Sequence, residues 1–401
     1  MKKPKIRFKG FTETWEQRKL GEICSRVQGN DGRMELPTLT ISAANGWMKQ
    51  EDRFTGNIAG KEQKNYTLLH KGELSYNHGN SKLAKYGTVF SLQTYEEALV
   101  PRVYHSFKVE IGSADFIEYF FATKMPDREL RKLISSGARM DGLLNIGYDD
   151  FMGIKMMFPS VLEQDKIAEY FRAFDHLITL HQRKCENLKK LKKFMLQKLF
   201  PQNGENVPEI RFSNFTDTWE QRKLGELVGI YDGVHQTPDY QDSGIMFLSV
   251  ENIATLKSEK YIAVEAFERD YKVYPEKGDI LMTRIGDVGT TNVVETVEKV
   301  AFYVSLALLK PNRIDSYFLS NAMKTNVFQK GLRERTLVTA IPQKINKDEI
   351  GKIDIFITNN DEEQKKIGAY FSNLDHLITL HQSKCDKLKE VKKYMLQNMF
   401  I

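Results

Sequence analysis

Apolar and small residues recur at alternating intervals of four and three positions along two long segments, residues 161–200 and 361–401. This spacing is the heptad pattern of a coiled coil, so each segment is predicted to form one long helix. No Gly or Pro interrupts residues 163–200, and Pro201 ends the pattern. The expected seam consists of Ile167, Phe171, Phe174, Ile178, His181, Cys185, Leu188, Lys192, Met195 and Leu199, repeated as Ile367, Phe371, Leu374, Ile378, His381, Cys385, Leu388, Lys392, Met395 and Met399.

Both segments carry a start signal. Ser160 precedes Glu163 by three residues, and Asn360 precedes Glu363 in the same way. A capping box is therefore expected at the N-terminus of each helix.

The two helices are expected to pair antiparallel, because the chain between them then has to travel only locally at one end. At about 1.5 Å per residue each helix is roughly 57 Å long. The pairing would place one domain at each end of a rod, bring Ile401 beside residues 6–22, and make the molecule pseudo-twofold.

The chain is an internal duplication. Residues 6–22 recur as residues 210–226 with 14 of 17 positions identical, and residues 163–200 recur as residues 363–400 with 24 of 38 identical. Between these near-constant segments lie two stretches that hardly resemble each other in sequence. A period of about 200 residues is too long for a solenoid, so the repeated unit is a domain with its connector.

The two dissimilar stretches still share a skeleton. Residues 71–78 (KGELSYNH) align with residues 277–284 (KGDILMTR), a turn followed by a short apolar strand. Further β-rich runs, a helix-like segment and a closing strand follow in both, which favours an α+β fold with two homologous α/β domains separated by the coiled coil. The expected division is 1–22 (an N-terminal repeat that completes the end of the second helix), 23–160 (first domain), 161–200 (central helix), 201–226 (linker and second repeat), 227–360 (second domain) and 361–401 (C-terminal helix).

The net charge of +6, from 59 Lys and Arg against 53 Asp and Glu, belongs to the helices. Residues 163–200 and 363–400 hold 16 basic against 9 acidic residues, which leaves 43 against 44 elsewhere. Many of these lysines are expected on solvated helix faces, and others along DNA phosphates or acidic partner surfaces.

Cysteine usage and hydropathy indicate a cytoplasmic protein that does not enter a membrane. The three cysteines (Cys24, Cys185 and Cys385) are too few for a disulfide framework, which indicates a reducing compartment. No run approaches eighteen uncharged apolar residues, and no apolar stretch follows the first residues, so neither a membrane span nor a secretory signal is expected.

Two related but diverged domains on a rod of fixed length are held at a fixed separation. Double-stranded DNA is a ligand that suits such an arrangement. DNA half-sites must be met at a set spacing and rotation, about 34–43 Å for one to one and a quarter turns. Diverged domains in one chain would read an asymmetric, two-part sequence.

The chain resembles the specificity (S) subunit of type I restriction-modification systems over essentially its whole length. The resemblance rests on EQDKIAEYF and EQKKIGAYF at the helix starts, the TWEQRKLGE repeats, and the KGELSYNHGN and KGDILMTRIGDVG turns. It implies two target-recognition domains that each read half of a bipartite target, spaced by helices that dock two methyltransferase subunits. The resemblance also implies that restriction and translocase subunits join that core in the full complex.

The chain is expected to be non-catalytic. It has no Gly-rich S-adenosylmethionine loop, no Asn/Asp-Pro-Pro-aromatic motif and no phosphate-binding loop. We therefore expect no cofactor here, and S-adenosylmethionine, ATP and Mg²⁺ on the partner subunits.

Candidate DNA-reading residues follow from base chemistry, in which Arg suits guanine and Asn or Gln suits adenine. The alternative for each residue is a polar side chain in a loop that contacts only solvent. The candidates are Asn77, His78, Asn80, Lys82, Lys85 and Arg139 in the first domain, and Thr283, Arg284, Arg333, Arg335, Thr339, Gln343 and Lys344 in the second.

The repeated aromatic residues and the His/Cys pairs of the helices are expected to be structural. Trp15 and Trp219 recur unchanged, whereas sequence readers ought to differ, so both are predicted to be packing anchors. His181 and Cys185 with His381 and Cys385 form a formal Cys₂His₂ set at mid-helix, but buried seam packing is favoured over zinc, and no metal is expected.

Two rival functions remain at this stage. One is a stand-alone bipartite DNA-binding regulator, and the other is a coiled-coil scaffold whose end domains bind proteins. Duplicated but diverged domains favour DNA over a scaffold, and repeated helices favour partner subunits over a lone regulator.

Overall fold

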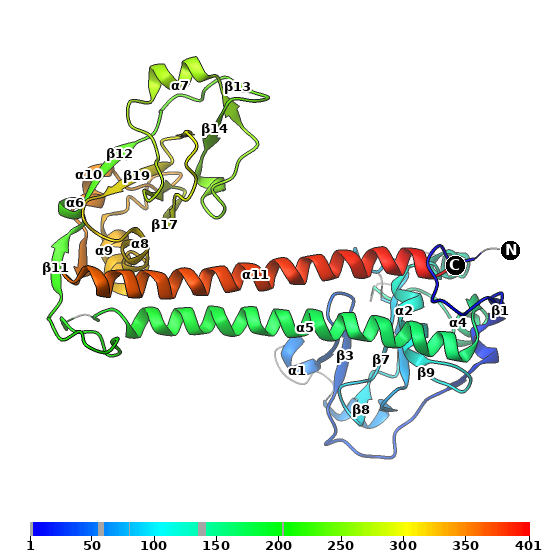
Figure 1. Ribbon diagram of the computed structural model, residues 1–401. Coiled ribbons are helices and arrows are strands. Elements are labelled where there is room, and N and C mark those ends of the chain that lie inside the picture. Colours follow the sequence, from blue (N-terminus) through cyan, green and yellow to red (C-terminus); the bar gives the residue numbers. More distant parts are fainter. Residues whose placement is uncertain (1–2, 55–59, 80, 135–141, 203) are drawn as a thin grey trace. The chain divides into compact units, whose positions relative to one another are not determined.

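The computed structural model describes residues 3–54, 60–79, 81–134, 142–202 and 204–401, and it divides into two compact units. Unit 1 comprises the chain up to His181 together with Lys384–Ile401, and unit 2 comprises Gln182–Ser383. Each unit therefore contains one domain, half of one long helix and half of the other (Figure 1).

Unit 1 is built around a four-stranded antiparallel sheet in the order β2-β9-β6-β7, with the pairs β3-β4, β5-β8 and β1-β10 beside it. Its elements are β1 (Glu16–Lys19), the 3-10 helix η1 (Leu20–Glu22), β2 (Cys24–Arg26), β3 (Leu39–Ser42), β4 (Gly46–Lys49), α1 (Gln50–Arg53), the 3-10 helix η2 (Gly60–Asn65), β5 (Thr67–His70), β6 (Leu74–Asn77), β7 (Thr88–Ser91), β8 (Glu97–Val100), β9 (His105–Val109), α2 (Ala114–Ala122), α3 (Asp127–Lys132), α4 (Tyr148–Met152) and β10 (Lys155–Phe158).

Unit 2 repeats this topology in a sheet ordered β12-β19-β16-β17 and a pair β11-β20, and adds a lobe whose mixed sheet is ordered β13-β15-β14-β18. Its elements are β11 (Glu220–Lys223), α6 (Leu224–Leu227), β12 (Val228–Asp232), β13 (Tyr240–Gln241), β14 (Ile245–Leu248), the 3-10 helix η3 (Val250–Asn252), β15 (Tyr261–Ile262), α7 (Val264–Asp270), β16 (Ile280–Ile285), β17 (Asp287–Val293), β18 (Val300–Phe302), β19 (Leu306–Pro311), α8 (Ser316–Ala322), α9 (Asn326–Arg335), α10 (Lys347–Gly351) and β20 (Asp354–Ile357).

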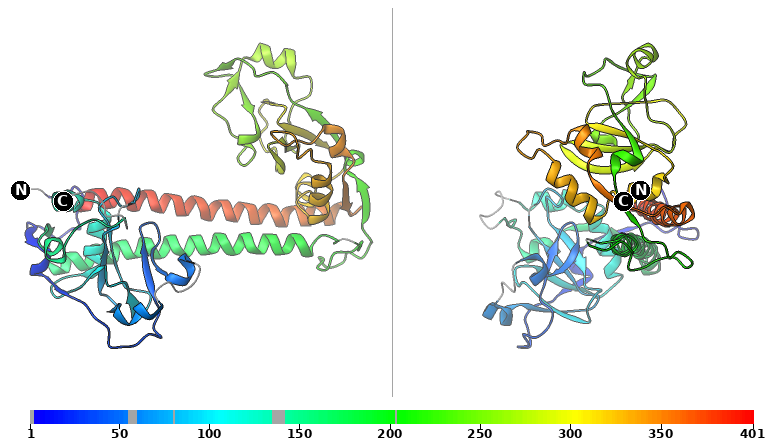
Figure 2. Two further views of the ribbon diagram at one scale, coloured as in Figure 1. Left: turned by 180° about the vertical axis from the view of Figure 1, so that it is seen from behind. Right: turned by 90° about the vertical axis from the view of Figure 1, so that its left-hand side faces the viewer.

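The two predicted long helices are present as α5 (Val161–Lys198) and α11 (Asp361–Met399), each without a break (Figure 2). Their pairing is antiparallel within each unit. In unit 1, Lys392 Nζ near the end of α11 lies 2.5 Å from Asp175 Oδ1 in the first half of α5. In unit 2, Lys192 Nζ lies 2.6 Å from both carboxylate oxygens of Asp375. The predicted antiparallel arrangement is confirmed.

Each core is completed by the end of the opposite long helix. In unit 1, Phe400 packs against Phe116 and Phe171, with ring centroids 5.3 and 5.9 Å apart. In unit 2, Phe200 packs against Phe318 and Phe371 at 5.5 and 6.1 Å. Phe200 and Phe400 are 1% and 3% exposed, so both helix ends are buried in the cores that they complete.

The tryptophan anchors behave as predicted. Trp15 is 6% exposed and meets Phe400 edge-on at 6.2 Å, and Trp219 is 3% exposed and meets Phe200 edge-on at 5.7 Å. Both belong to the main aromatic core of their unit. Packing, and not base stacking, accounts for their recurrence.

The predicted capping boxes are half wrong. Asn360 Oδ1 accepts a hydrogen bond from the backbone N–H of Glu363, as expected for a cap. The Glu163 and Glu363 carboxylates instead bind Arg7 and Arg211, because these buried acids need a full counter-charge.

Candidate nucleic-acid interface

The candidate DNA-reading residues of unit 2 come from two distant segments that the fold brings together. The return loop, residues 336–344, lies beside the end of β16. Ile345 N–H donates to the carbonyl of Arg284 (3.0 Å), and Gly286 N–H donates to the carbonyl of Gln343 (2.8 Å). Gln343 Nε2 also donates to the Gly286 carbonyl at 3.0 Å.

The contact between the end of β16 and a later segment is the junction of unit 2. Unit 1 has a matching junction at the end of β6, made by different residues. Leu144 N–H donates to the carbonyl of His78 at 2.9 Å, which is the counterpart of the bond from Ile345 to Arg284. Gly79 and Leu143 form the matching antiparallel bridge. Two of the candidates in this region, Asn80 and Arg139, lie outside the described residues.

Six candidates present exposed side chains, and Arg335 is half-buried near Glu349, with Nε 3.9 Å from the carboxylate. The exposed set can reach a ligand without rearrangement of the domain. It consists of Lys82 and Lys85 in the β6–β7 loop, and Arg333, Thr339, Gln343 and Lys344 in unit 2.

Asn77 and Thr283 occupy the same position in the two sheets. The side chain of each forms a hydrogen bond with the segment that follows its strand. Asn77 Oδ1 accepts from the Gly79 N–H (3.0 Å) while its Nδ2 donates to the Ile41 carbonyl (3.2 Å). Thr283 is fully buried, and its hydroxyl oxygen accepts from the Thr290 N–H at 2.9 Å. Both side chains shape the junction, and their contact with bases stays a prediction.

Arg284 is held by a partner that no sequence pattern revealed. Its guanidinium donates to Asp232 at the end of β12, and its side chain is 9% exposed. Its Nε is buried with no hydrogen-bond partner in the described part of the chain. Since β12, β19 and β16 are adjacent strands, the pair is a product of sheet order, which residue spacing does not encode.

His78 lies in an aromatic cluster beneath the unit 1 junction. It is 6% exposed, and its ring centroid lies 4.9 Å from that of His105 and 6.1 Å from that of Tyr76. Burial lowers the pKa of His105 to about 4, although its hydrogen bond to the Ile146 carbonyl opposes the shift. His105 is therefore uncharged near neutral pH, and base contact by His78 stays a prediction.

The return loop also presents an apolar tip that sequence reasoning missed. Ile341 is 100% exposed, Val338 69% and Leu337 45%. These residues stand between polar candidates, so composition alone gave no sign of their exposure.

The long helices expose a second apolar feature, the flank stripe, whose residues each precede a seam position by one. Each unit presents its own version, drawn from both helices. Unit 1 exposes Leu177, Val391 and Tyr394, and unit 2 exposes Leu377, Leu380, Leu191 and Phe194.

The mid-helix cysteines pack as seam residues. Cys185 is 4% exposed and its Sγ lies 3.8 Å from Gln382 Oε1, and Cys385 is 2% exposed. Within the described residues, no group of three or more His, Cys, Asp and Glu side chains is arranged to hold a metal ion. The described helices likewise include none with the length and apolar character of a membrane span.

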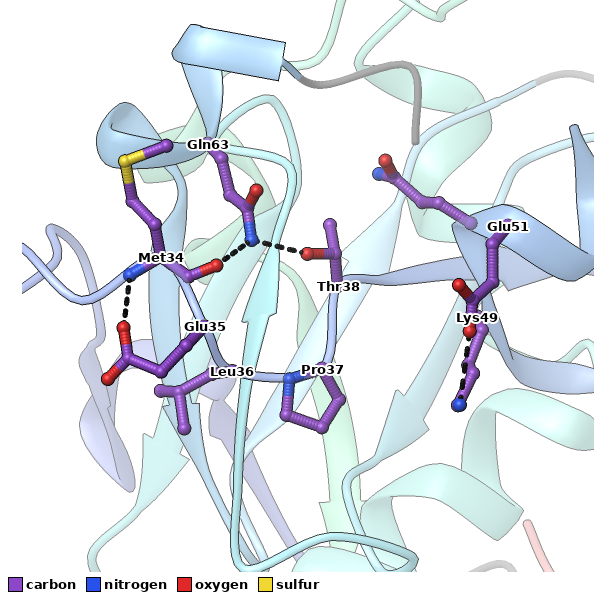
Figure 3. Close-up of a pocket in the computed structure, with 9 residues that line it drawn as sticks. Met34, Glu35, Leu36, Pro37, Thr38, Lys49, Glu51 and Gln63 are labelled. Carbon is purple, nitrogen blue, oxygen red and sulfur yellow. Dashed lines mark hydrogen bonds and ion pairs between the residues drawn. The ribbon is translucent and has the colours of Figure 1, made fainter. Parts of the chain in front are cut away.

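A pocket of about 370 Å³ lies in the first domain between residues 34–38, α1 and η2 (Figure 3). Gln63 Nε2 donates to the Met34 carbonyl (2.5 Å) and to Thr38 Oγ1 (2.7 Å). The described residues that line it include no His, Cys or Ser. These contacts tie the 34–38 segment to η2, which is a structural role.

Known proteins resemble this chain in sequence and in fold. The model of the type I restriction modification DNA specificity domain matches residues 216–390. The type I restriction enzyme MjaVIII specificity subunit of Methanocaldococcus jannaschii is 24% identical over 298 residues, which is 70% of this chain and 68% of that protein. The putative MjaX specificity subunit of the same organism is 26% identical over 216 residues, 49% of this chain and 48% of that protein.

Two solved structures share the fold. The crystal structure of the S subunit of the type I restriction-modification system from M. genitalium has a TM-score of 0.67 at 16% identity, over 100% of this chain and 99% of that one. A chain from a structure on complex assembly and conformational transition of the type I system has a TM-score of 0.50 at 15% identity, over 97% and 98%. The resemblance expected from the sequence is confirmed.

Proposed function

We propose that each domain of this chain, which resembles type I restriction-modification specificity subunits in sequence and in fold, reads one half of an asymmetric, bipartite target in double-stranded DNA. The observation that carries the proposal is the repeated junction. The same sheet order and matching backbone bonds place the buried His78 at the junction of one domain and the buried Arg284 at that of the other.

The exposed candidates differ between the domains in the way that two readers of different sequences require. The first domain offers Lys82 and Lys85, and the second offers Arg333, Gln343 and Lys344. Gln can bind adenine and Arg guanine with paired hydrogen bonds, whereas lysines also serve as phosphate contacts.

The long helices set the gap between the half-sites and dock two methyltransferase subunits. An unbroken 38-residue helix is about 57 Å long, enough for half-sites separated by about one helical turn of DNA. The flank stripe supports the docking role, because exposed apolar residues along a helix mark an interaction surface. Its presence in both units fits one methyltransferase per unit.

The chain acts as the targeting subunit and leaves chemistry to its partners. Methyltransferase subunits would bring S-adenosylmethionine, and restriction and translocase subunits would bring ATP and Mg²⁺. DNA affinity then depends on the whole complex, since outside the helices the chain is close to electrically neutral.

Co-expression with the cognate methyltransferase, followed by mapping of methylated adenines, tests the proposal. One two-part motif with a fixed gap is the expected result. Unmodified DNA would contradict it and would favour a stand-alone regulator or a protein scaffold.

A chimera sharpens the same test. A chain whose residues 227–360 are replaced by residues 23–160 carries two copies of the first reader, and its complex with the methyltransferase should methylate an inverted repeat of the first half-site. A chimera that keeps the original asymmetric motif would show that the domains do not read the half-sites.

A further inference from the structure

The tip of the return loop is apolar and faces water. Ile341 is fully exposed and Val338 is 69% exposed, although exposing such side chains on an ordered loop has a free-energy cost. We therefore expect these two exposed aliphatic side chains to bind an apolar surface of a ligand.

Backbone hydrogen bonds close the base of the loop and attach it to the sheet. Leu337 N–H donates to the Lys344 carbonyl at 2.7 Å, which closes the loop at its base. The bonds between Gly286 and Gln343 then attach it to the turn after β16. The tip is therefore presented at a set position relative to Arg284.

The surroundings of the tip favour a polyanion over a protein surface. Residues 336–344 contain Lys344 and no acidic residue, and Arg333 in the last turn of α9 is exposed. A stable protein interface buries about 800 Å² on each side. Two aliphatic side chains are too few for that, but they suffice to enter a base step, because DNA-bending proteins use single Leu, Ile or Pro wedges.

We propose that Val338 and Ile341 insert from the groove between neighbouring base pairs of the second half-site and partly unstack them. Base steps differ in the energy of unstacking, so the second domain reads deformability in addition to hydrogen-bonding groups. The inference rests on the proposed function, because it requires the second domain to contact DNA.

The test uses the full chain assembled with its methyltransferase on a duplex that carries the mapped target. 2-Aminopurine is placed in turn at each purine of the second half-site, away from the methylated adenine. Binding should raise the fluorescence at one step, because unstacking relieves quenching. Ile341→Ser should abolish that rise and weaken binding to the target roughly 10-fold or more. Ile341→Leu should keep both the fluorescence rise and the affinity of the wild type.

Val297→Ser is the matched control, since Val297 is an aliphatic residue that is 84% exposed on another loop of the same domain. It should leave fluorescence and affinity unchanged. A wild-type complex that methylates the target without a fluorescence rise in the second half-site would overturn this inference alone. A complex that methylates no DNA would overturn the proposed function as well. An Ile341→Ser variant that retains the fluorescence rise and the affinity also overturns the inference.

Discussion

The guanidinium of Arg7 binds the carboxylate of Glu163 through two parallel hydrogen bonds, both 2.7 Å long. Unit 2 repeats the arrangement, with Arg211 bound to Glu363 at 2.6 and 2.8 Å. The glutamates are 1% and 0% exposed, so each repeat segment supplies the counter-charge for a buried acid in the first turn of a long helix. The pairs explain why Arg recurs in the IRF sequence ahead of each domain.

Arg7→Ala should destabilise unit 1 by about 3–5 kcal/mol, because it leaves the Glu163 carboxylate buried without a partner. Chemical unfolding followed by circular dichroism measures the loss. The double variant Arg7→Ala with Glu163→Gln should recover part of it, since no charge is then left buried. A loss below about 1 kcal/mol in the single variant would contradict the assigned role.

Glu118 should make the stability of unit 1 fall as pH rises from about 4.5 to about 7. Burial raises the pKa of its carboxyl from 4.5 to about 7, although a hydrogen bond from the Ser91 N–H opposes the shift. In that window the unfolded chain has lost the proton that the folded chain keeps, so protonation favours folding at lower pH. Glu118→Gln should remove this fall, as measured by the unfolding free energy across pH.

His105 should have the opposite effect in nearly the same window. Burial lowers its pKa from 6.5 to about 4, so between these values the unfolded chain binds a proton that the folded chain does not. Stability from this group is therefore present above pH 6.5 and is lost as pH falls toward 4. The two effects partly offset each other in the wild type, and His105→Gln should expose the slope due to Glu118. Identical pH profiles for the wild type and both variants would contradict both assignments.

Lys344→Ala should impair recognition of the second half-site and leave the first unchanged. A base contact is worth about 1–3 kcal/mol, whereas a phosphate contact would weaken binding to all sequences and lower the salt slope by about one. Competition binding with duplexes altered in one half-site distinguishes the two.

Arg284→Ala is a less direct probe, because it also removes the partner of Asp232. Arg284→Ala should therefore lower stability as well as specificity, and Asp232→Asn should weaken the positioning of Arg284 while keeping its charge. Full stability of Arg284→Ala would argue against a structural contribution from this pair.

Leu177→Glu and Leu377→Glu should each remove one methyltransferase from the complex. Each residue belongs to the flank stripe of a different unit, at 41% and 39% exposure, and a charge in an apolar contact is unfavourable. Native mass spectrometry should find one methyltransferase with either variant and none with both. Lys189→Glu, which follows a seam position instead of preceding one, is the control and should keep two.

Local and periodic features of this fold were predictable from sequence. The heptad spacing located α5 and α11, and the alignment of residues 71–78 with 277–284 identified the equivalent strands β6 and β16. Both features depend on neighbours in the chain, which is why pattern alone identifies them.

Features that depend on long-range contacts were not predictable. Glu163 and Glu363 looked like the acidic members of capping boxes, but each buried carboxylate binds an arginine instead, and Arg7 lies 156 positions from Glu163. The pairing of Arg284 with Asp232 depends on strand order, and the full exposure of Ile341 depends on where the return loop is anchored. The polarity of a residue does not reveal whether its side chain will form hydrogen bonds within the domain, as those of Thr283 and Asn77 do.

The closure of the unit 1 core by Phe400 sets an order of events during synthesis. Trp15, Phe116 and Phe171 leave the ribosome long before Phe400 exists, so the first domain waits with its aromatic core incomplete. Residues 182–383 carry every part of unit 2 and are finished earlier. The domain encoded first is therefore completed last, and until then its incomplete aromatic core is a surface through which the nascent chain can aggregate.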